Sequence, residues 1–268
     1  MTVEIIESQV LRISGNEAEP AADAVVVEEP LEICVATEPA VVVMRTPGHD
    51  FDLACGFALG EGLIDDAAEI GTVGYGDPAE FNRVEIHPVP GHEFRRPAGD
   101  RLMPASAACG VCGTKSIDSI RANVADLNAA PGSIELGRLL SLPGRMRFFQ
   151  DVFDSTGGLH AAGLFDLDGQ LVAVREDVGR HCAVDKIVGH LARQGRGTHP
   201  GDILCVSGRA GFEIVQKAAA ARIAIVVAVS APSSLAIDLA EATGITLAAF
   251  VRDGGGNIYT HGHRVVRS

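Results

Sequence analysis

The chain has 268 residues, of which 47% are hydrophobic, 21% are charged and only 4% are aromatic, so Ala, Val, Ile and Leu must fill the core of one large or two small domains. Its formal net charge of -13 at pH 7 excludes nucleic acid as a main partner, because such partners require clustered Lys and Arg. An anionic small molecule is still allowed, since local arginines and helix N-termini bind phosphate inside acidic proteins.

The N-terminal segment "MTVEIIESQVLRISGNEAEP" lacks the basic region and apolar run of a secretory signal. The longest apolar runs, such as "IAIVVAV" at 223–229, are far shorter than the roughly 20 residues of a membrane span. We therefore expect a cytoplasmic protein without membrane association. In that compartment its six cysteines should stay reduced rather than form a disulfide framework.

Residues 1–105 are predicted to form a smaller β-rich part with one helix and a flexible linker. Strand-like runs occur in "AVVVEEPLEICVA", in "AVVVMRTP" and up to "RVEIHPV", and "DFDLACGFALGEGLI" predicts the helix. Residues 88–104 are rich in proline, glycine and charge, which predicts the linker.

Residues 106–268 are predicted to form an α/β domain that carries a C-x-x-C loop, Cys109 and Cys112 of "PASAACGVCGTKSIDSI". A helical pattern follows this loop, a second helix is predicted over 144–153, and Asp168-Gly169 predicts a hairpin. Helices over 178–193, 211–222 and 232–243 then alternate with the apolar runs "DILCVSG", "IAIVVAVS" and "ITLAAFVR", before a final "IYTH". The alternation predicts a layered, mixed and mostly parallel sheet with helices on both faces.

The C-x-x-C pair is compatible with a metal site, disulfide exchange or sulfur relay. Zinc needs three or four protein ligands, and neither a second C-x-x-C pair nor the H-x-E signature of zinc deaminases accompanies the two cysteines; we expect no metal. Disulfide exchange and sulfur relay both suit a glycine-flanked thiol near a helix N-terminus, where its pKa is lowered. The spacing does not separate them. The remaining cysteines lie in apolar or helical contexts that favour buried packing: Cys34, Cys55, Cys182 and Cys205.

Polar residues concentrate beside the predicted strand ends. His160 follows two glycines and is a candidate for tuning a thiolate or handling a proton. The ionisable residues of "REDVGRHCAVDK", residues 175–186, predict the wall of a site. "VSGRAGFEIVQK" and "VSAPSS" each follow an apolar strand and open a helix, where α/β sheets bind ligands. Their candidates for a nucleotide diphosphate are Ser207, Arg209, Ser230 and Ser233.

The segments "VSGRAGFEIVQK" and "VSAPSS" also have a simpler interpretation. Neither is a nucleotide-binding fingerprint, so a glycine turn without a ligand is the alternative. In "FVRDGGGNIYTHGHR" three consecutive glycines permit either a plain hairpin turn or close approach of a bulky ligand to the backbone, beside Arg252.

Together the motifs resemble the formate dehydrogenase accessory sulfurtransferases, the FdhD family. The matching segments span residues 28–261 in family order: "EEPLEI", "DLACGFALGEGLI", "CGVCG", "TGGLHAAGL", "REDVGRHCAVDK", "SGRAGFEIVQKAAAA", "VSAPSSLAIDLAE" and "FVRDGGGNIYTH". The resemblance implies a cytidine deaminase-like fold for the C-terminal half. It also implies that Cys109 bears a persulfide with Cys112 as its partner. The implied cofactor-binding turn consists of Phe250, Val251, Arg252, Asp253, Gly254 and Gly255.

The function implied by this resemblance is a sulfur carrier. It would accept persulfide sulfur from a cysteine desulfurase and transfer it to the bis-guanine-dinucleotide molybdenum (or tungsten) cofactor before insertion into formate dehydrogenase, and GDP would mimic part of that cofactor. Two alternatives remain: a non-catalytic chaperone that binds the cofactor, and a zinc-dependent hydrolase. A homodimer is a further expectation, because the cofactor has two equivalent nucleotide arms.

Overall fold

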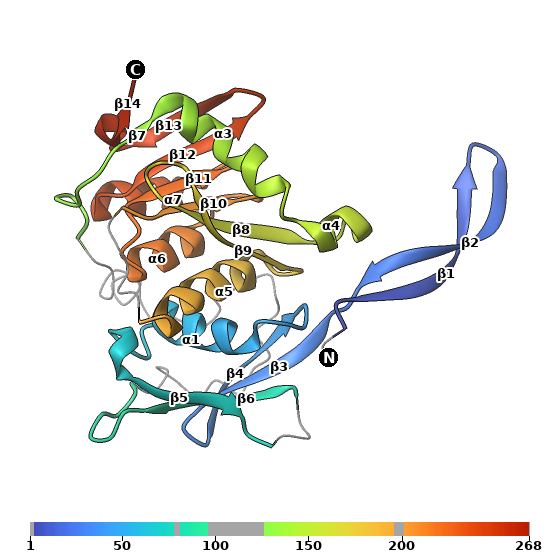
Figure 1. Ribbon diagram of the computed structural model, residues 1–268, viewed down its shortest axis with the longest axis horizontal. Coiled ribbons are helices and arrows are strands. Elements are labelled where there is room, and N and C mark those ends of the chain that lie inside the picture. The colour runs from blue at the N-terminus through green and yellow to red at the C-terminus, as the bar shows by residue number, and fades with distance from the viewer. Residues whose placement is uncertain (1–2, 78–80, 96–125, 196–200, 268) are drawn as a thin grey trace.

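The computed structural model describes residues 3–77, 81–95, 126–195 and 201–267. Cys109, Cys112 and nearly all of the helix predicted after them lie outside the described residues. The largest sheet has six strands in the order β13-β12-β11-β10-β8-β9 (Figure 1). Its strands are β8 (His160–Phe165), β9 (Leu171–Asp177), β10 (Ile203–Val206), β11 (Ile225–Ala228), β12 (Thr246–Arg252) and β13 (Gly255–Thr260).

The mixed α/β class is confirmed, but the parallel pairings are confined to the middle of the sheet. β10 pairs in parallel with β11, and β11 with β12, whereas the pairings β10–β8, β8–β9 and β12–β13 are antiparallel. Short turns join β8 to β9 and β12 to β13, and short turns connect only antiparallel strands. The expectation of mostly parallel pairing is therefore wrong, while the hairpin at Asp168-Gly169 is confirmed.

Helices cover both faces of this sheet, as predicted. The helices α5 (Arg180–Arg193), α6 (Phe212–Ala220) and α7 (Ser234–Thr243) lie on one face and α3 (Leu136–Arg147) on the other. Along each strand alternate residues enter the two apolar clusters, so that Leu204 and Val206 face α5 and α6, and Ile203 and Cys205 face α3.

The helix predicted over residues 144–153 is wrong in its bounds. Pro143 and Gly144 resemble a helix start, but α3 begins at Leu136, where the Glu135 carboxylate accepts the N–H groups of Gly137 and Arg138, both at 2.9 Å. The helix ends at Arg147, and the short helix α4 (Asp151–Thr156) follows it.

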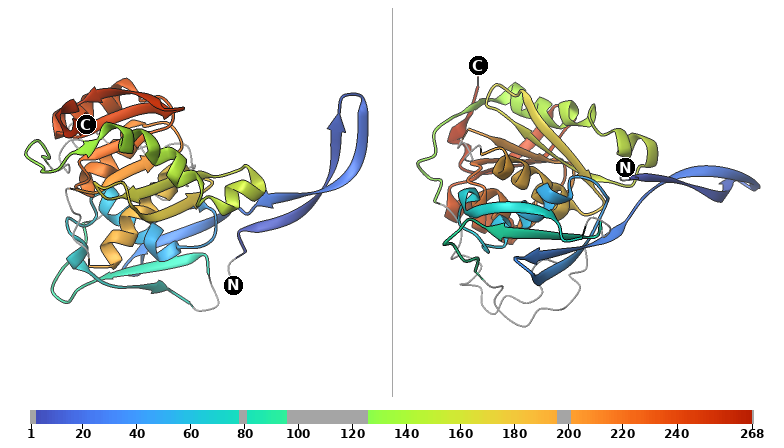
Figure 2. Two further views of the ribbon diagram at one scale, coloured as in Figure 1. Left: turned by 45° about the horizontal axis from the view of Figure 1, so that its top comes forward. Right: turned by 60° about the horizontal axis from the view of Figure 1, so that its bottom comes forward.

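The N-terminal part consists of two small sheets and one helix. A four-stranded sheet in the order β4-β3-β6-β5 packs on the helix α1 (Asp50–Gly60). A two-stranded hairpin, β1 paired with β2, projects from this body (Figures 1 and 2). The strands are β1 (Ile5–Ser14), β2 (Glu17–Val26), β3 (Glu29–Val35), β4 (Glu38–Arg45), β5 (Ile70–Tyr75) and β6 (Arg83–Pro88). A short pair, β7 (Ile134–Glu135) with β14 (Val265–Val266), lies beside α3.

The two parts are joined where α1 crosses α5. A β-carbon at Gly56 would lie 1.9 Å from the Asp185 carbonyl oxygen, and one at Gly189 would lie 1.7 Å from that of Asp52, so only glycine permits this approach. One apolar cluster continues from the N-terminal sheet through α1 to α5 and the six-stranded sheet.

The predicted boundary near residue 105 falls outside the described residues, and the division into two domains stays a prediction. No helix in the described part of the chain has the length and apolar character of a membrane span.

Candidate functional site

The predicted site residues that the structure describes gather at one edge of the six-stranded sheet. The parallel strands β10, β11 and β12 end at this edge, β8 starts there at His160, and β9 ends there because Asp177 pairs with His160. The helices α5, α6 and α7 therefore begin at the same edge, which we call the carboxyl edge (Figure 1). Ligands of open α/β sheets bind at this position.

His160 occupies the centre of the carboxyl edge. Its half-buried ring lies against Gly208, where a β-carbon would be 3.3 Å from Nδ1. Burial lowers the pKa of His160 below 6.5, and the charges of Arg180 and His181 lower it further. The imidazole is therefore neutral at pH 7, when it can accept or donate a proton.

His181 is held by a carboxylate of the next helix. Its Nε2 lies within ion-pair distance of Glu213 Oε2, and both side chains are largely buried. Burial alone would raise the pKa of Glu213, but the hydrogen bond and charge of His181 lower it. This pair could not be predicted from the sequence, since Glu213 stands in "GFEIVQK" without a spacing that links it to His181.

Ser207 and Ser230 connect the strand ends through hydrogen bonds, Ser207 with its hydroxyl and Ser230 with its backbone. Ser207 Oγ accepts the N–H of Ala161 at 2.9 Å, which leaves its hydroxyl hydrogen for another acceptor. The Ser230 N–H donates to the Gly208 carbonyl at 3.3 Å, and the Ser230 carbonyl accepts the N–H of Phe250 at 3.1 Å. These hydrogen bonds link the ends of β8, β10, β11 and β12 along one edge.

The turn between β12 and β13 contains unusual backbone. Phe250 and Asp253 have φ angles of 55° and 54°, in the left-handed region, and Gly254 has 75°. Phe250, Arg252, Asp253, Gly254 and Gly255 are exposed. The Val251 side chain is instead completely buried in the cluster under α3, so that only its backbone could meet a ligand.

Cationic side chains and helix N-termini flank this turn. Arg209 and Arg252 are exposed, and among the described residues neither side chain has an ion pair or hydrogen bond. The helices α5 and α6 start after Gly179 and Gly211, which provide no capping side chain, so their first N–H groups remain available for an anion. Ser233 caps α7, because its hydroxyl accepts the Ala236 N–H at 3.2 Å.

Only part of the segment "REDVGRHCAVDK" faces this edge. Arg180 and His181 do so, but Arg175 binds Asp52 at 3.1 Å and the buried Lys186 binds Asp177 at 2.8 Å. The Arg175–Asp52 pair attaches α1 to the six-stranded sheet, whereas the Lys186–Asp177 pair joins α5 to β9. Within residues 175–186, only the start of α5 therefore faces the carboxyl edge, and Arg175 and Lys186 have structural roles.

The four described cysteines are buried, as expected, and none forms a disulfide. Burial raises the pKa of Cys34 to about 11 and that of Cys55 to about 12, and it also raises the pKa of Cys182 and Cys205. These thiols are poor nucleophiles. Within the described ranges, no group of three or more His, Cys, Asp or Glu side chains is arranged to hold a metal ion.

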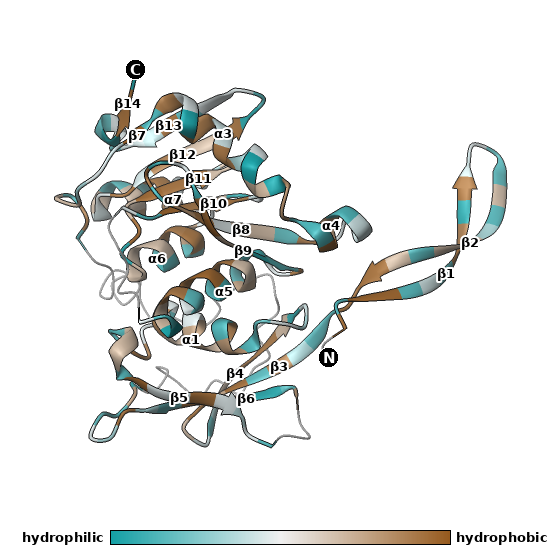
Figure 3. Cartoon of the chain, in the orientation of Figure 1, coloured by the Kyte–Doolittle hydropathy of each residue, from teal (hydrophilic) through white to brown (hydrophobic). Residues whose placement is uncertain are grey.

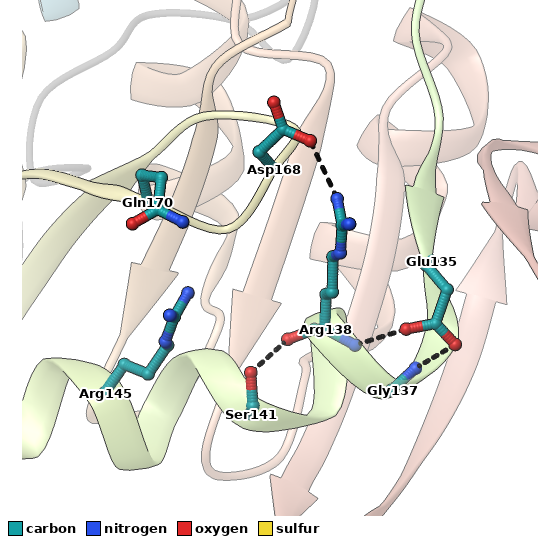
Figure 4. Close-up of a pocket in the computed structure, with 7 residues that line it drawn as sticks. All are labelled: Glu135, Gly137, Arg138, Ser141, Arg145, Asp168 and Gln170. Atoms are coloured by element: carbon teal, nitrogen blue, oxygen red, sulfur yellow. Dashed lines mark hydrogen bonds and ion pairs between the residues drawn. The ribbon is translucent and has the colours of Figure 1, made fainter.

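A separate open pocket of about 610 Å³ lies between α3 and the β8–β9 turn, away from the carboxyl edge (Figure 4). Its charged groups are already paired: Arg138 binds Asp168 at 2.8 Å, and Arg145 donates to the carbonyl of Gly169. The Glu135 carboxylate caps α3. These contacts attach α3 to the β8–β9 turn, so the charged groups of the pocket have a structural role.

Known proteins resemble this chain along nearly its whole length. The sequence profile of the FdhD/NarQ family matches residues 26–266. The sulfur carrier protein FdhD of Streptomyces avermitilis is 43% identical over 96% of this chain and 94% of its own. The same-named protein of Anaeromyxobacter sp. (strain K) is 46% identical over 97% and 93%.

A solved structure shares the fold. It is the crystal structure of a protein described as a formate dehydrogenase accessory protein from Desulfotalea psychrophila, which superposes with a TM-score of 0.80 over 98% of this chain and 100% of its own, at 24% identity. The arrangement of sheets and helices is therefore common to both proteins. On the strength of the profile match and the curated relatives, the chain belongs to the FdhD/NarQ family.

Proposed function

We propose that this protein is a sulfur carrier that supplies sulfur to the bis-guanine-dinucleotide molybdenum cofactor of a formate dehydrogenase. The observation that carries the proposal is the convergence of His160, Arg209 and the β12–β13 turn at one sheet edge. Relatives over 40% identical along nearly the whole chain are named sulfur carrier proteins, and the structural neighbour is described as a formate dehydrogenase accessory protein.

The sulfur would travel as a persulfide on Cys109. The Cys109 thiolate attacks the outer sulfur of a persulfide on a cysteine desulfurase; the S–S bond of the donor breaks, and the donor cysteine leaves as a thiolate. Attack by the Cys112 thiolate on the inner sulfur then forms a Cys109–Cys112 disulfide and releases the outer sulfur as hydrosulfide at the acceptor. Cys109 and Cys112 must both be reduced before sulfur is accepted, which agrees with the cytoplasmic location we propose.

The assignment of this role to Cys109 and Cys112 is supported by the state of the other thiols. A carrier cysteine must ionise near neutral pH, and burial raises the pKa of all four described cysteines well above that range. All four are buried, so a donor persulfide has no direct access to their sulfur atoms. The C-x-x-C pair is the remaining source of a reactive thiol.

The acceptor is a large anion, and the carboxyl edge has the groups that such an anion requires. The uncapped starts of α5 and α6 offer N–H groups to a diphosphate. Arg209 and Arg252 offer charge, and the exposed ring of Phe250 offers a surface for a guanine base. Neutral His160 lies among them and could take up or return the proton of a thiol.

Intact-protein mass spectrometry tests the carrier role. After incubation with a cysteine desulfurase and cysteine, the wild-type chain should gain one sulfur, about 32 Da. The Cys109→Ala variant should gain none and should fail to mature formate dehydrogenase, whereas Cys182→Ala serves as the matched control and should behave as the wild type. A Cys109→Ala variant with full maturation activity would exclude the sulfur transfer.

The alternative is a non-catalytic chaperone that binds the cofactor, and it is favoured by the same carboxyl edge. Titration calorimetry with GDP addresses binding independently of sulfur. Arg209→Ala should weaken GDP binding about tenfold, which corresponds to about 1.4 kcal/mol. Arg222→Ala, an exposed arginine after α6 at the opposite edge, should not. Intact GDP binding combined with no mass gain would favour the chaperone.

A further inference from the structure

Four ionisable side chains form two pairs between α5 and α6. His181 and Asp185 lie one turn apart on α5, and Glu213 and Lys217 lie one turn apart on α6. Figure 3 shows α5 between α6 and α1, with hydrophilic residues among its hydrophobic ones. His181 contacts Glu213 at the carboxyl edge, where both helices begin, and the buried Asp185 binds the buried Lys217 one turn further in, at 2.8 Å.

The inner pair keeps the Glu213 carboxylate available for His181. Residues four apart on a helix are neighbours, so Lys217 would otherwise pair with Glu213. Its Nζ lies instead 2.8 Å from Asp185 and 3.5 Å from Glu61, which follows the last residue of α1. Lys217 is thus engaged by two other carboxylates, and Glu213 forms its ion pair with His181.

The contact with Glu213 uses only one nitrogen of the His181 ring. Nε2 faces the carboxylate, whereas in the described part of the chain Nδ1 makes no hydrogen bond. A carboxylate that holds one ring nitrogen orients the imidazole and stabilises its protonated form, so that the other nitrogen can exchange a proton with a reacting group. His181 therefore has the arrangement of a proton donor, and Glu213 has that of the group which positions it.

His160 and His181 lie close enough for the charge of His181 to act on His160, but their surroundings differ. His160 packs against the backbone of Gly208 and is neutral at pH 7, whereas His181 contacts a carboxylate. Titratable groups in such different surroundings often divide the roles of base and acid. The ionisable groups around His181 are Arg180 and Asp185 of α5, Glu213 and Lys217 of α6, and His160 of β8.

The release step of a sulfur carrier needs a proton donor. A persulfide is more acidic than a thiol, so the outer sulfur on Cys109 carries a negative charge at neutral pH. Without a proton this sulfur would leave as the sulfide dianion, and so basic a leaving group departs slowly. Protonation during cleavage of the S–S bond allows it to leave as hydrosulfide.

We propose that His181 is the general acid of this step and that Glu213 positions it, an inference that rests on the proposed carrier function. The Cys112 thiolate attacks the inner sulfur and forms the Cys109–Cys112 bond, while the bond to the outer sulfur breaks and leaves its electron pair on that sulfur. The outer sulfur takes the Nδ1 proton of the His181 imidazolium and departs as hydrosulfide. Water then returns the proton to the neutral ring, and a thiol reductant restores the two cysteines.

A single-turnover measurement of hydrosulfide separates release from uptake. The full chain is loaded with a cysteine desulfurase and cysteine, freed of both, and checked for one added sulfur by intact mass. Wild type and His181→Gln should load equally, but the variant should release hydrosulfide at least tenfold more slowly. The matched control is His263→Gln in η2 (Gly262–Arg264), an exposed residue beyond the far end of β13, and it should behave as the wild type.

The pH dependence and chemical rescue distinguish an acid from a structural residue. Wild-type release should rise with pH as Cys112 ionises and fall again as His181 loses its proton, whereas His181→Gln should show only the rise. Imidazole in the buffer should accelerate release by His181→Ala and leave the wild type unchanged. Glu213→Gln, which keeps the ring, should move the fall to lower pH, and it provides the test if circular dichroism shows that the His181 variants do not fold.

Two outcomes would overturn the proposal in different ways. Equal release rates with the same pH dependence in wild type, His181→Gln and Glu213→Gln would exclude the acid role and leave the carrier function intact. A wild-type chain that takes up no sulfur would instead exclude the carrier function, and the role of His181 with it.

Discussion

The ring of His160 rests directly on the backbone of Gly208, two residues beyond the end of β10. A β-carbon at position 208 would lie 3.3 Å from Nδ1 of the ring, which is tighter than an ordinary contact. The glycine thus fixes the position of the histidine against the turn that carries Ser207 and Arg209.

Gly208→Ala should displace His160 without unfolding the protein. The added methyl group forces the ring or the turn to move by a few tenths of an ångström, so GDP affinity should fall about threefold to tenfold, or about 0.7–1.4 kcal/mol. Calorimetry at pH 7.5 measures the loss. Gly74→Ala, in β5 of the N-terminal sheet, is the matched control, since nothing lies within 4 Å of its β-carbon. Unchanged affinity in Gly208→Ala would place the ligand away from this histidine.

The stability of the protein should fall on acidification through the titration of His160. Its pKa is lowered in the folded state, so the unfolded chain binds the proton more readily, and this stability contribution is present above pH ~6.5 and lost as the pH falls through the folded-state pKa. His160→Gln should therefore lose less stability than the wild type between pH 7.5 and pH 5 in urea titrations.

A direct measurement of the His160 pKa provides a control for the stability experiment. In NMR titrations the His160 signal should report a pKa below 6.5, and Arg180→Gln should raise it, because the Arg180 charge contributes to the shift. A His160 pKa unaffected by that substitution would contradict the proximity of these two groups.

Substitution of the helix-crossing glycines should be severe. Gly56→Ala and Gly189→Ala place a β-carbon under 2 Å from the backbone of the facing helix, and overpacking of this extent should cost about 3 kcal/mol or more. Gly144→Ala, in α3 with nothing within 4 Å, should instead stabilise by about 0.5–1 kcal/mol. Urea unfolding compares the three variants, and similar effects at all three positions would argue against the close crossing.

Native-state labelling should distinguish the buried thiols from the C-x-x-C pair. Because burial raises the pKa of the four described cysteines, a thiol reagent at pH 7 should modify at most Cys109 and Cys112 quickly. A Cys109→Ala/Cys112→Ala variant should react only after denaturation. Rapid labelling of Cys182 in that variant would contradict its burial.

Much of the C-terminal fold was predictable because its signals are local. Apolar strands followed by helices specify β10 to β12 with α6 and α7, and Asp168-Gly169 specifies the hairpin. The pairing directions at the margins of the sheet were not predictable, because they depend on which strands a short turn joins. The start of α3 could not be predicted from the sequence. Its N-cap is the side chain of Glu135, and glutamate is not a common N-cap residue.

The site was predictable to a similar degree. His160, Ser207, Arg209 and Ser230 could be identified as strand-end residues, and the topology brings them to one edge. The burial of Val251 depends on the strand alternation of β12, and the contact between His181 and Glu213 depends on how α5 packs beside α6. Such tertiary placement is not encoded in spacing along the chain.

The crossing of α1 over α5 also determines how this protein can be dissected. A fragment that begins after residue 125 would leave the Gly189 surface of α5 and the inner side of its apolar cluster in water, and Lys186 would lose the Thr46 carbonyl that it binds at 2.9 Å. We expect such a fragment to aggregate rather than fold. The two parts must therefore be expressed together in one chain.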